Sequence, residues 1–127
     1  MIERLFPPGV PTPRNPYSPA VKAGGFIFVS GQIPFDPATN DMSYGSIQHE
    51  TKVTLANIQA ILEGSGSSLK DVVKCNVYLA DENDFAGMNE IYITFFPGDR
   101  PARTTVGCRF ANPTMKVEID CIAYAGE

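Results

Sequence analysis

The sequence predicts an α+β fold in which two helices cover one face of a mixed β-sheet. Three observations predict it. Segments of strand composition alternate with two segments of helical periodicity, in the order strands, helix, strand, helix and two strands. The 127 residues suffice for one domain, which buries roughly two thirds of its unfolded surface. Apolar residues make up 43% of the chain and charged residues 19%, as in ordinary globular proteins.

The first part of the chain predicts a proline-rich lead-in followed by a strand. Six prolines between residues 7 and 19 exclude a helix or a central strand there. Residues 1–16 are therefore expected to be an extended lead-in to the single domain. Residues 26–30 have strand composition and end at Gly31, and a short strand is expected after the turn formers at 36–41.

Two helices are predicted, one on each side of a strand at residues 72–79. Ser46 is expected to cap the first helix, and glycines at 64 and 66 to end it. Residues 81–84 are expected to cap the second helix, which residues 97–101 end. The apolar stripes that predict these helices are Ile47, Thr51, Leu55, Ile58 and Leu62 in the first, and Phe85, Met88, Tyr92, Phe95 and Phe96 in the second.

Residues 100–125 predict two closing strands joined by a short turn at 111–114. Because side chains alternate across a strand, each strand has one apolar face that is expected to pack on the core. Arg103 and Glu118 are then expected to share the opposite, uncovered face. The faces expected on the core are Thr104, Val106, Cys108 and Phe110 in the first strand, and Val117, Ile119, Cys121 and Ala123 in the second.

An arginine and an acid on one face allow two interpretations. The guanidinium can bind a small carboxylate while the acid transfers a proton or positions a water molecule. Alternatively, the two side chains form an ordinary ion pair across neighbouring strands, or are simply solvated. The uncovered face also holds Ile122 and Tyr124, and a half-apolar open face is usually covered by another subunit. The sequence therefore predicts a homo-oligomer with Arg103 and Glu118 near the contact.

Charge and composition exclude several classes of partner. The net charge of −4 and the absence of a basic stripe disfavour nucleic acid. No apolar run approaches the ~20 residues that span a bilayer, and residues 1–7 lack the apolar core of a secretory signal. No membrane partner is therefore expected, and the expected location is the cytoplasm.

Cysteine and histidine usage narrows the chemistry further. Cys75, Cys108 and Cys121 fall in apolar phase within predicted strands, as reduced and buried cysteines do. His49 is the single histidine, so a Ser-His-Asp triad or a His-ligated metal site is not expected. Any acid–base catalysis must then be carried out by carboxylates, backbone groups or water.

Four short blocks carry a resemblance to a known family. They are V-S-G-Q-I-P at 29–34, D-F-A-G-M-N at 84–89 followed by Tyr92, P-A-R at 101–103, and K-V-E-I-D-C-I-A at 116–123. Their order and spacing, from Asn15 to Tyr124, resemble the RidA (YjgF) family of reactive-intermediate deaminases. The resemblance implies a chorismate-mutase-like fold in a homotrimer with a central barrel and clefts between subunits. It also implies cofactor-free hydrolysis of 2-enamine and 2-imine acids, such as 2-aminoacrylate, to 2-keto acids and ammonia.

The resemblance also implies which residues form the site. By the family's pattern, Arg103 clamps the substrate carboxylate and Glu118 positions or activates water. Tyr17 lines the cleft, and Ser30, Asn89 and the backbone of Thr105 match positions that help hold ligand or water. Tyr17, Ser30 and Asn89 each have a structural alternative: core packing for Tyr17, the end of a strand for Ser30 and a backbone hydrogen bond for Asn89. No metal is expected.

Three departures from the family's pattern leave the substrate open. The segment before Tyr17 is unusually rich in proline, the connection at 97–100 is short, and Thr105 stands where close relatives often have cysteine. The first two changes bear on the size of the cleft. Two alternatives to a general deaminase therefore remain: a pathway-specific deaminase, acting for example on 2-aminomuconate, and a non-catalytic regulator that binds a small carboxylate.

Overall fold

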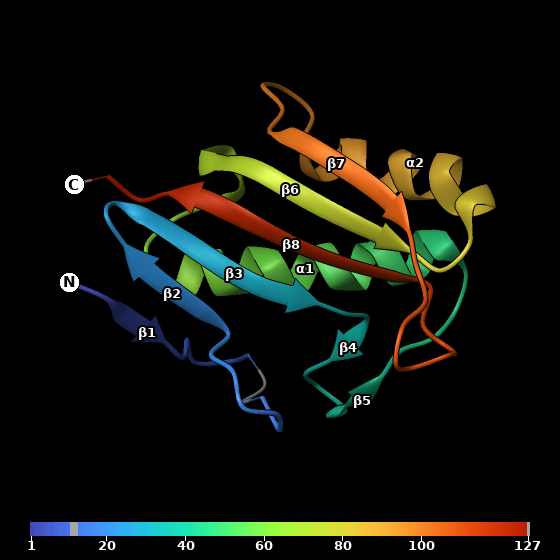
Figure 1. The fold of residues 1–127 in the computed structure, drawn as a ribbon, viewed down its shortest axis with the longest axis horizontal. Helices are drawn as coiled ribbons and strands as arrows, with labels where there is room; N and C mark the ends of the chain where they lie inside the picture. Colours follow the sequence, from blue (N-terminus) through green and yellow to red (C-terminus); the bar gives the residue numbers. More distant parts are fainter. Residues whose placement is uncertain (11–12, 127) are drawn as a thin grey trace.

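A computed structural model describes residues 1–10 and 13–126. Its centre is a six-stranded sheet in the order β1-β2-β3-β8-β6-β7, with a separate two-stranded hairpin, β4-β5 (Figure 1). The strands are β1 (Glu3–Leu5), β2 (Ala20–Ala23), β3 (Phe26–Gln32), β4 (Phe35–Asp36), β5 (Asp41–Met42), β6 (Val72–Leu79), β7 (Ala102–Gly107) and β8 (Val117–Tyr124). Two long helices, α1 (Ile47–Gly64) and α2 (Phe85–Phe95), are each accompanied by a short 3-10 turn, η1 (Leu69–Asp71) or η2 (Glu82–Asp84).

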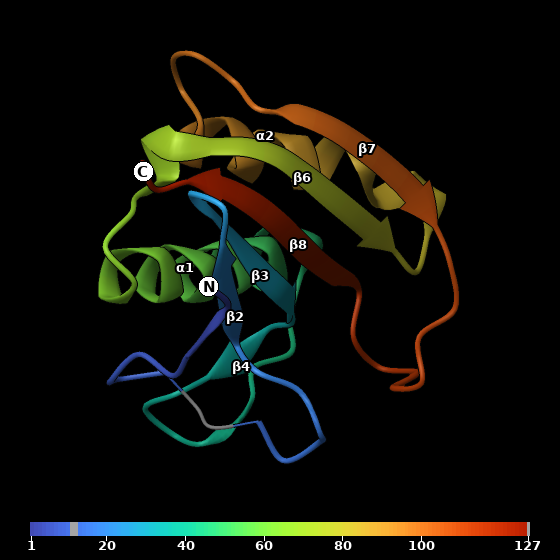
Figure 2. The same ribbon diagram turned by 60° about the vertical axis from the view of Figure 1, so that its left-hand side comes forward.

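Both long helices cover the same face of the sheet, as the sequence predicts. They lie behind the strands in Figure 1, and Figure 2 shows α1 behind β3 with α2 behind β6 and β7. The side chains facing them form one core, in which Ile27, Leu55, Val77, Met88 and Ile119 are fully buried. The other face of the sheet carries no helix in the described residues.

The predicted ends of α1 are confirmed, and Asp84 stands at the N-cap of α2 without a side-chain cap hydrogen bond. Ser46 caps α1, its hydroxyl accepting the backbone N–H of His49 at 3.1 Å. The helix ends at Gly64, and Gly66 follows in the left-handed region with φ of 86°. Helix α2 begins at Phe85, directly after η2, and buries Met88 and Tyr92 against the sheet.

The closing strands differ from the sequence prediction in their pairing. Strand β6 lies between β7 and β8, running parallel to β7 and antiparallel to β8, so the closing strands do not pair with each other. Strand β7 ends at Gly107, and Cys108 and Phe110 belong to the connection that leads to β8. The sequence prediction also omitted β1 and β2. The connection from Cys108 to Lys116 is long enough to pass over β6, which lies between β7 and β8. The turn residues at 111–114 therefore do not indicate that β7 and β8 form a hairpin.

The predicted faces of β7 are reversed. Arg103 is opposite Cys75 of β6 and Thr105 is opposite Val77, and both partners are buried on the helix side. Val106 is 42% exposed on the uncovered face instead of packing on the core. In β8, Glu118 is opposite Tyr78 and lies on the uncovered face, as predicted. Arg103 and Glu118 of one chain therefore project from opposite faces of the sheet, which corrects the expectation that they share one.

Candidate functional site

Arg103 lies on the edge strand β7, where α2 packs beneath it. Its guanidinium donates a 2.7 Å hydrogen bond to Oδ1 of Asn89. The guanidinium carbon is 4.8 Å from the ring centroid of Tyr92 and 5.6 Å from that of Phe85, so two aromatic rings flank the charge. These contacts use one donor and fix the plane of the group, which leaves other N–H groups available for a ligand.

A hollow of about 400 Å³ adjoins this guanidinium. It lies between α2 and the segment that leads into β7, and Arg100 of the short connection at 97–100 is part of its lining. Its charged residues are Arg103 and Arg100, and no carboxylate lines it. Its lining consists of Asn89, Tyr92, Ile93, Arg100, Pro101 and Arg103. Such a lining favours an anionic ligand.

Glu118 occupies a second hollow, of about 490 Å³, at the other face of the sheet. Strand β8 supplies Glu118, β3 supplies Ser30 and Gly31, and the proline-rich segment supplies Tyr17. The full lining is Asn15, Tyr17, Ser30, Gly31, Ile33, Phe110, Ala111, Asn112, Met115 and Glu118. The loop side of this hollow is fastened by a 2.9 Å hydrogen bond from the Asn112 amide to the Tyr44 hydroxyl.

The carboxyl group of Glu118 is set for proton exchange. Its partial burial, and secondarily the nearby charge of Asp120, raise its pKa above the usual range. Asp120 is itself held by Asn76 at 2.8 Å and by the Tyr78 hydroxyl at 2.9 Å. The latter hydrogen bond raises the pKa of Tyr78, which therefore remains a proton donor to Asp120. Glu118 thus stands beside a fixed negative charge, with no cation paired to it in the described residues.

The six predicted site residues divide into two groups. Asn89 and Thr105 lie with Arg103 on the helix side, and the Thr105 hydroxyl is buried without a hydrogen-bond partner. Tyr17 and Ser30 lie with Glu118 in the other hollow, and Tyr17 is 49% exposed. The Ser30 hydroxyl donates to the backbone oxygen of Ser18 at 2.6 Å, so it anchors the segment that carries Tyr17. A single chain therefore contains two half-sites, the Arg103 hollow and the Glu118 hollow.

Several residues of these half-sites were missed as functional candidates. Phe85 and Tyr92 were predicted only as core, yet they flank the guanidinium. Gly31 was interpreted as the end of a strand, and Phe110, Asn112 and Met115 were not singled out. Turn composition at 111–114 signals only a loop, and no spacing rule connects it to Glu118.

The described residues offer little for metal binding or for catalysis by a cysteine thiol. No cluster of three His, Cys, Asp or Glu side chains there could hold a metal ion. Burial raises the pKa of the Cys75 thiol, the strand neighbour of Arg103, to about 11, which keeps it protonated at neutral pH. In the part of the chain that the structure describes, neither long helix combines the length and the apolar character needed to cross a membrane.

Comparisons with known proteins agree with this architecture. A family model described as Endoribonuclease L-PSP matches residues 9–125. The RutC family protein PH0854 of Pyrococcus horikoshii is 48% identical over 124 residues, which are 98% of each chain. Two Escherichia coli structures, TdcF with bound serine and the YjgF gene product, are each 33% identical, with a TM-score of 0.89 over 96% of this chain and 98% of theirs. The chain belongs to the RidA (YjgF) family.

Membership of the RidA family confirms the resemblance seen in the four sequence blocks. It accounts for the mixed sheet with two helices on one face, which the chain shares with the Rid protein YyfA of Yersinia pestis at a TM-score of 0.93 and 32% identity. The names within the family differ in the activity they state, since the matching family model is described as an endoribonuclease. Membership therefore gives the fold and the general family, and the reaction has to be argued from the half-sites.

Proposed function

We propose that the protein is an enamine/imine deaminase that hydrolyses reactive 2-imino acids, such as the imine formed from 2-aminoacrylate, to 2-keto acids and ammonia. The proposal rests on one observation: each half-site holds a charged or titratable group that the other lacks. One holds an oriented guanidinium without an acid, and the other holds a proton-exchanging carboxyl group without a cation. Together they supply both functions that imine hydrolysis needs, a carboxylate clamp and a group that moves protons.

The proposed site forms between two copies of the chain. Arg103 is on the edge strand β7, so a neighbouring copy can reach it past the edge of the sheet. The uncovered face offers an apolar surface for that neighbour, with Phe26, Phe28, Val106 and Tyr124 each at least 37% exposed. We infer a homotrimer in the cytoplasm whose uncovered faces line a central barrel, with Arg103 of one copy facing Glu118 of the next.

The proposed reaction proceeds by addition of water to the imine carbon. Two N–H groups of Arg103 bind the substrate carboxylate, a geometry that a lysine cannot reproduce. The imine reacts in its N-protonated form. Glu118, as the carboxylate, takes a proton from the attacking water while the C–O bond forms, and the C=N π electrons move to nitrogen, which gives a neutral amine. Glu118 returns that proton to the nitrogen and then takes the hydroxyl proton as the C–N bond breaks, which releases ammonia and leaves the 2-keto acid. An enamine substrate first takes a proton on carbon to become the imine.

One solved relative supports a small polar ligand, and the charge of this chain disfavours RNA. TdcF was solved with bound serine, an amino acid that carries the same carboxylate. RNA cleavage by acid–base catalysis would be served by a basic surface, whereas this chain has a net charge of −4. Its only histidine, His49, is exposed and its ring contacts the Ser43 hydroxyl at 2.8 Å, away from both hollows.

Mixing two inactive variants tests the proposal. Arg103→Ala and Glu118→Ala are each expected to lose accelerated keto-acid release from 2-iminobutanoate made by a threonine dehydratase. Equal mixing with subunit exchange is expected to restore activity, because about one cleft in four then combines an intact Arg103 with an intact Glu118. Light scattering of the native protein is expected to give three times the 13.8 kDa chain mass.

The outcomes separate the alternatives. No restoration after verified exchange would contradict a cleft shared between copies. Native protein that binds 2-oxobutanoate without accelerating the release of any keto acid would be a carboxylate-binding regulator instead. Activity confined to 2-aminomuconate would indicate a pathway-specific deaminase. RNA cleavage that survives in both variants would contradict the proposed role of these residues.

A further inference from the structure

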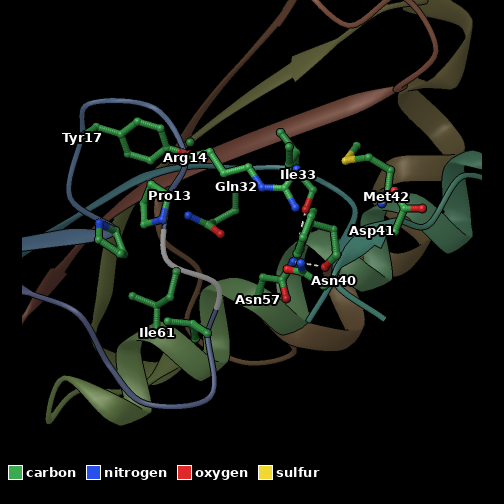
Figure 3. A pocket seen from close by; sticks show the side chains of 14 residues that line it. Pro13, Arg14, Tyr17, Gln32, Ile33, Asn40, Asp41, Met42, Asn57 and Ile61 are labelled. Carbon is green, nitrogen blue, oxygen red and sulfur yellow. Dashed lines mark hydrogen bonds between the residues drawn. The ribbon is translucent and has the colours of Figure 1, made fainter. Parts of the chain in front are cut away.

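A third hollow shares Gly31 in its lining with the Glu118 hollow. It has a volume of about 270 Å³, near the lower end of the range for small-molecule sites, and opens between the proline-rich segment, the β4-β5 hairpin and α1 (Figure 3). Apolar side chains from all three parts line it, including Pro13, Ile33, Phe35, Met42 and Ile61. The deaminase proposal makes no use of this pocket.

The walls of the pocket are held in place by the chain itself. The buried amide of Asn57, on α1, donates to the backbone oxygens of Ile33 at 3.2 Å and Phe35 at 2.7 Å. Met42 is paired with Phe35 across the β4-β5 hairpin. On the opposite side, the backbone N–H of Ser30 donates to the oxygen of Pro19 at 3.0 Å, which secures the segment carrying Tyr17. These contacts fix the wall formed by Ile33, Phe35 and Met42 and the end of the proline-rich segment at Pro19, so a ligand would spend little free energy on ordering that part of the pocket.

Arg14 brings a positive charge to this apolar pocket. Its side chain extends from the proline-rich segment across the pocket toward Ile33, as Figure 3 shows. The one ion pair among the described residues joins Lys116 and Glu50, so no carboxylate there neutralises Arg14. Asp41 lines the end beside Met42, where its carboxylate accepts the Met42 backbone N–H at 2.8 Å. A guanidinium beside an apolar wall is suited to a carboxylate that carries an apolar group.

We propose that this pocket binds a small carboxylate with a branched or aromatic apolar tail. The carboxylate pairs with Arg14, and the tail lies against Ile33, Met42 and Ile61. The pocket shares Tyr17, Gly31 and Ile33 with the Glu118 hollow, so its ligand would contact residues that also line the hollow of the proposed substrate. The inference concerns binding alone and stands independently of the deaminase reaction.

Methyl NMR with 4-methylpentanoate as the probe tests this site. The probe has a branched tail and lacks the 2-keto or 2-imino group of the proposed substrates. Saturable shifts are expected at the methyl groups of Met42 and Ile61. Any shift at the methyl groups of Ile93, which lines the Arg103 hollow, is expected to be lost in Arg103→Gln, whereas the shifts at Met42 and Ile61 are retained. Absence of a saturable shift at Met42 and Ile61 overturns the proposal.

Three variants and one matched ligand identify the contacts. Arg14→Gln is expected to weaken binding about tenfold or more, while Arg109→Gln, which removes an exposed charge elsewhere, leaves it within about twofold. Arg103→Gln is likewise expected to retain binding. The amine 3-methylbutylamine, with the same branch and the opposite charge, is expected not to bind. Unchanged affinity in Arg14→Gln, loss of binding in Arg103→Gln, or equal binding of the amine each overturns the proposal.

Discussion

The carboxylate of Glu118 lies directly against Gly31, in the space that the Cβ of any other residue would occupy. Gly31 belongs to the irregular part of β3, where the pairing with β8 shifts register between Val29 and Gln32. The irregular register and the missing side chain together let Glu118 fold back over the strand. The position of the proposed proton-transfer group therefore depends on a glycine in a different element.

Gly31→Ala is expected to displace the Glu118 carboxylate. The added methyl group overlaps that carboxylate, so we expect a loss of about 1–3 kcal/mol in the free energy of unfolding and a fall in kcat/KM of roughly 10- to 100-fold. Urea unfolding and the dehydratase-coupled assay measure the two effects. Gly98→Ala is the matched control, because a Cβ at Gly98 meets nothing within 4 Å. Native kcat/KM in Gly31→Ala would show that activity does not need Glu118 in this position.

Asn89 is expected to act by positioning Arg103. Asn89→Ala removes the 2.7 Å hydrogen bond to the guanidinium, and we expect kcat/KM to fall about tenfold because the clamp loosens. Asn89→Asp places a negative charge in the same position, where it competes with the substrate carboxylate and is expected to raise KM more than it lowers kcat. Steady-state kinetics separates the two variants. Glu90→Ala, at an exposed neighbouring position on α2, should have native constants, and a native KM in Asn89→Asp would contradict the carboxylate clamp.

The pH profile of the proposed deaminase is expected to report the raised pKa of Glu118. Its carboxylate is the active form, so kcat/KM should rise with pH through a midpoint above the usual glutamate range. Asp120→Asn removes the neighbouring charge that contributes to this shift and should move the midpoint to lower pH. An acid limb that is the same in both proteins would show that another group titrates.

Folding stability should respond to the same group. Because the folded chain holds the Glu118 proton more tightly than the unfolded chain, the free energy of unfolding should fall as pH rises from the usual glutamate pKa to the raised value. Glu118→Gln cannot titrate and should lose that part of the slope. Urea unfolding of the native protein and of Glu118→Gln at several pH values measures it, and equal slopes would contradict the raised pKa of Glu118.

Local features were predictable from the sequence because their causes are local. The Ser46 cap, the end of α1 at Gly64 and the alternation of β8 each depend on a few adjacent residues. The face of Arg103 does not. Strand β7 is an edge strand whose side chains are half-buried on one face and exposed on the other, so neither face has the apolar pattern that identifies a core. Tyr92 and Phe85, which make the helix side favourable for a guanidinium, are contributed by α2.

The alternation of side chains along each strand could not predict that the site divides into two half-sites, because alternation does not give the order of the strands. Placing Arg103 and Glu118 on one face required β7 and β8 to be compared in a common register. Strand β6 separates them and sets each register independently, Cys75 opposite Arg103 and Tyr78 opposite Glu118. The order of strands is a property of the whole sheet, and the residues at 111–114 carry no information about it.

The fully buried carboxylate of Glu50 joins the two loops that precede α1 and β8. Its Oε1 accepts the backbone N–H of Lys116 at 2.8 Å, and its Oε2 accepts the backbone N–H of Gly45 at 3.1 Å. The Lys116 ammonium lies 3.4 Å from Oε2, with 40% of its side chain exposed. Because Lys116 is two residues before Glu118, this buried carboxylate also fixes the start of the strand that presents the proposed catalytic acid.

Glu50→Ala is expected to lower the free energy of unfolding by about 2–4 kcal/mol, because two backbone donors lose their acceptor inside the protein. Lys116→Met removes only the half-exposed ammonium and should cost less than about 1 kcal/mol, since the backbone N–H of residue 116 keeps its bond. Urea unfolding compares the two, and Glu63→Ala, at an exposed position on α1, should stay within about 0.5 kcal/mol of the native protein. Equal losses for Glu50→Ala and Lys116→Met would assign the stabilisation to the ion pair and contradict the role of the backbone hydrogen bonds.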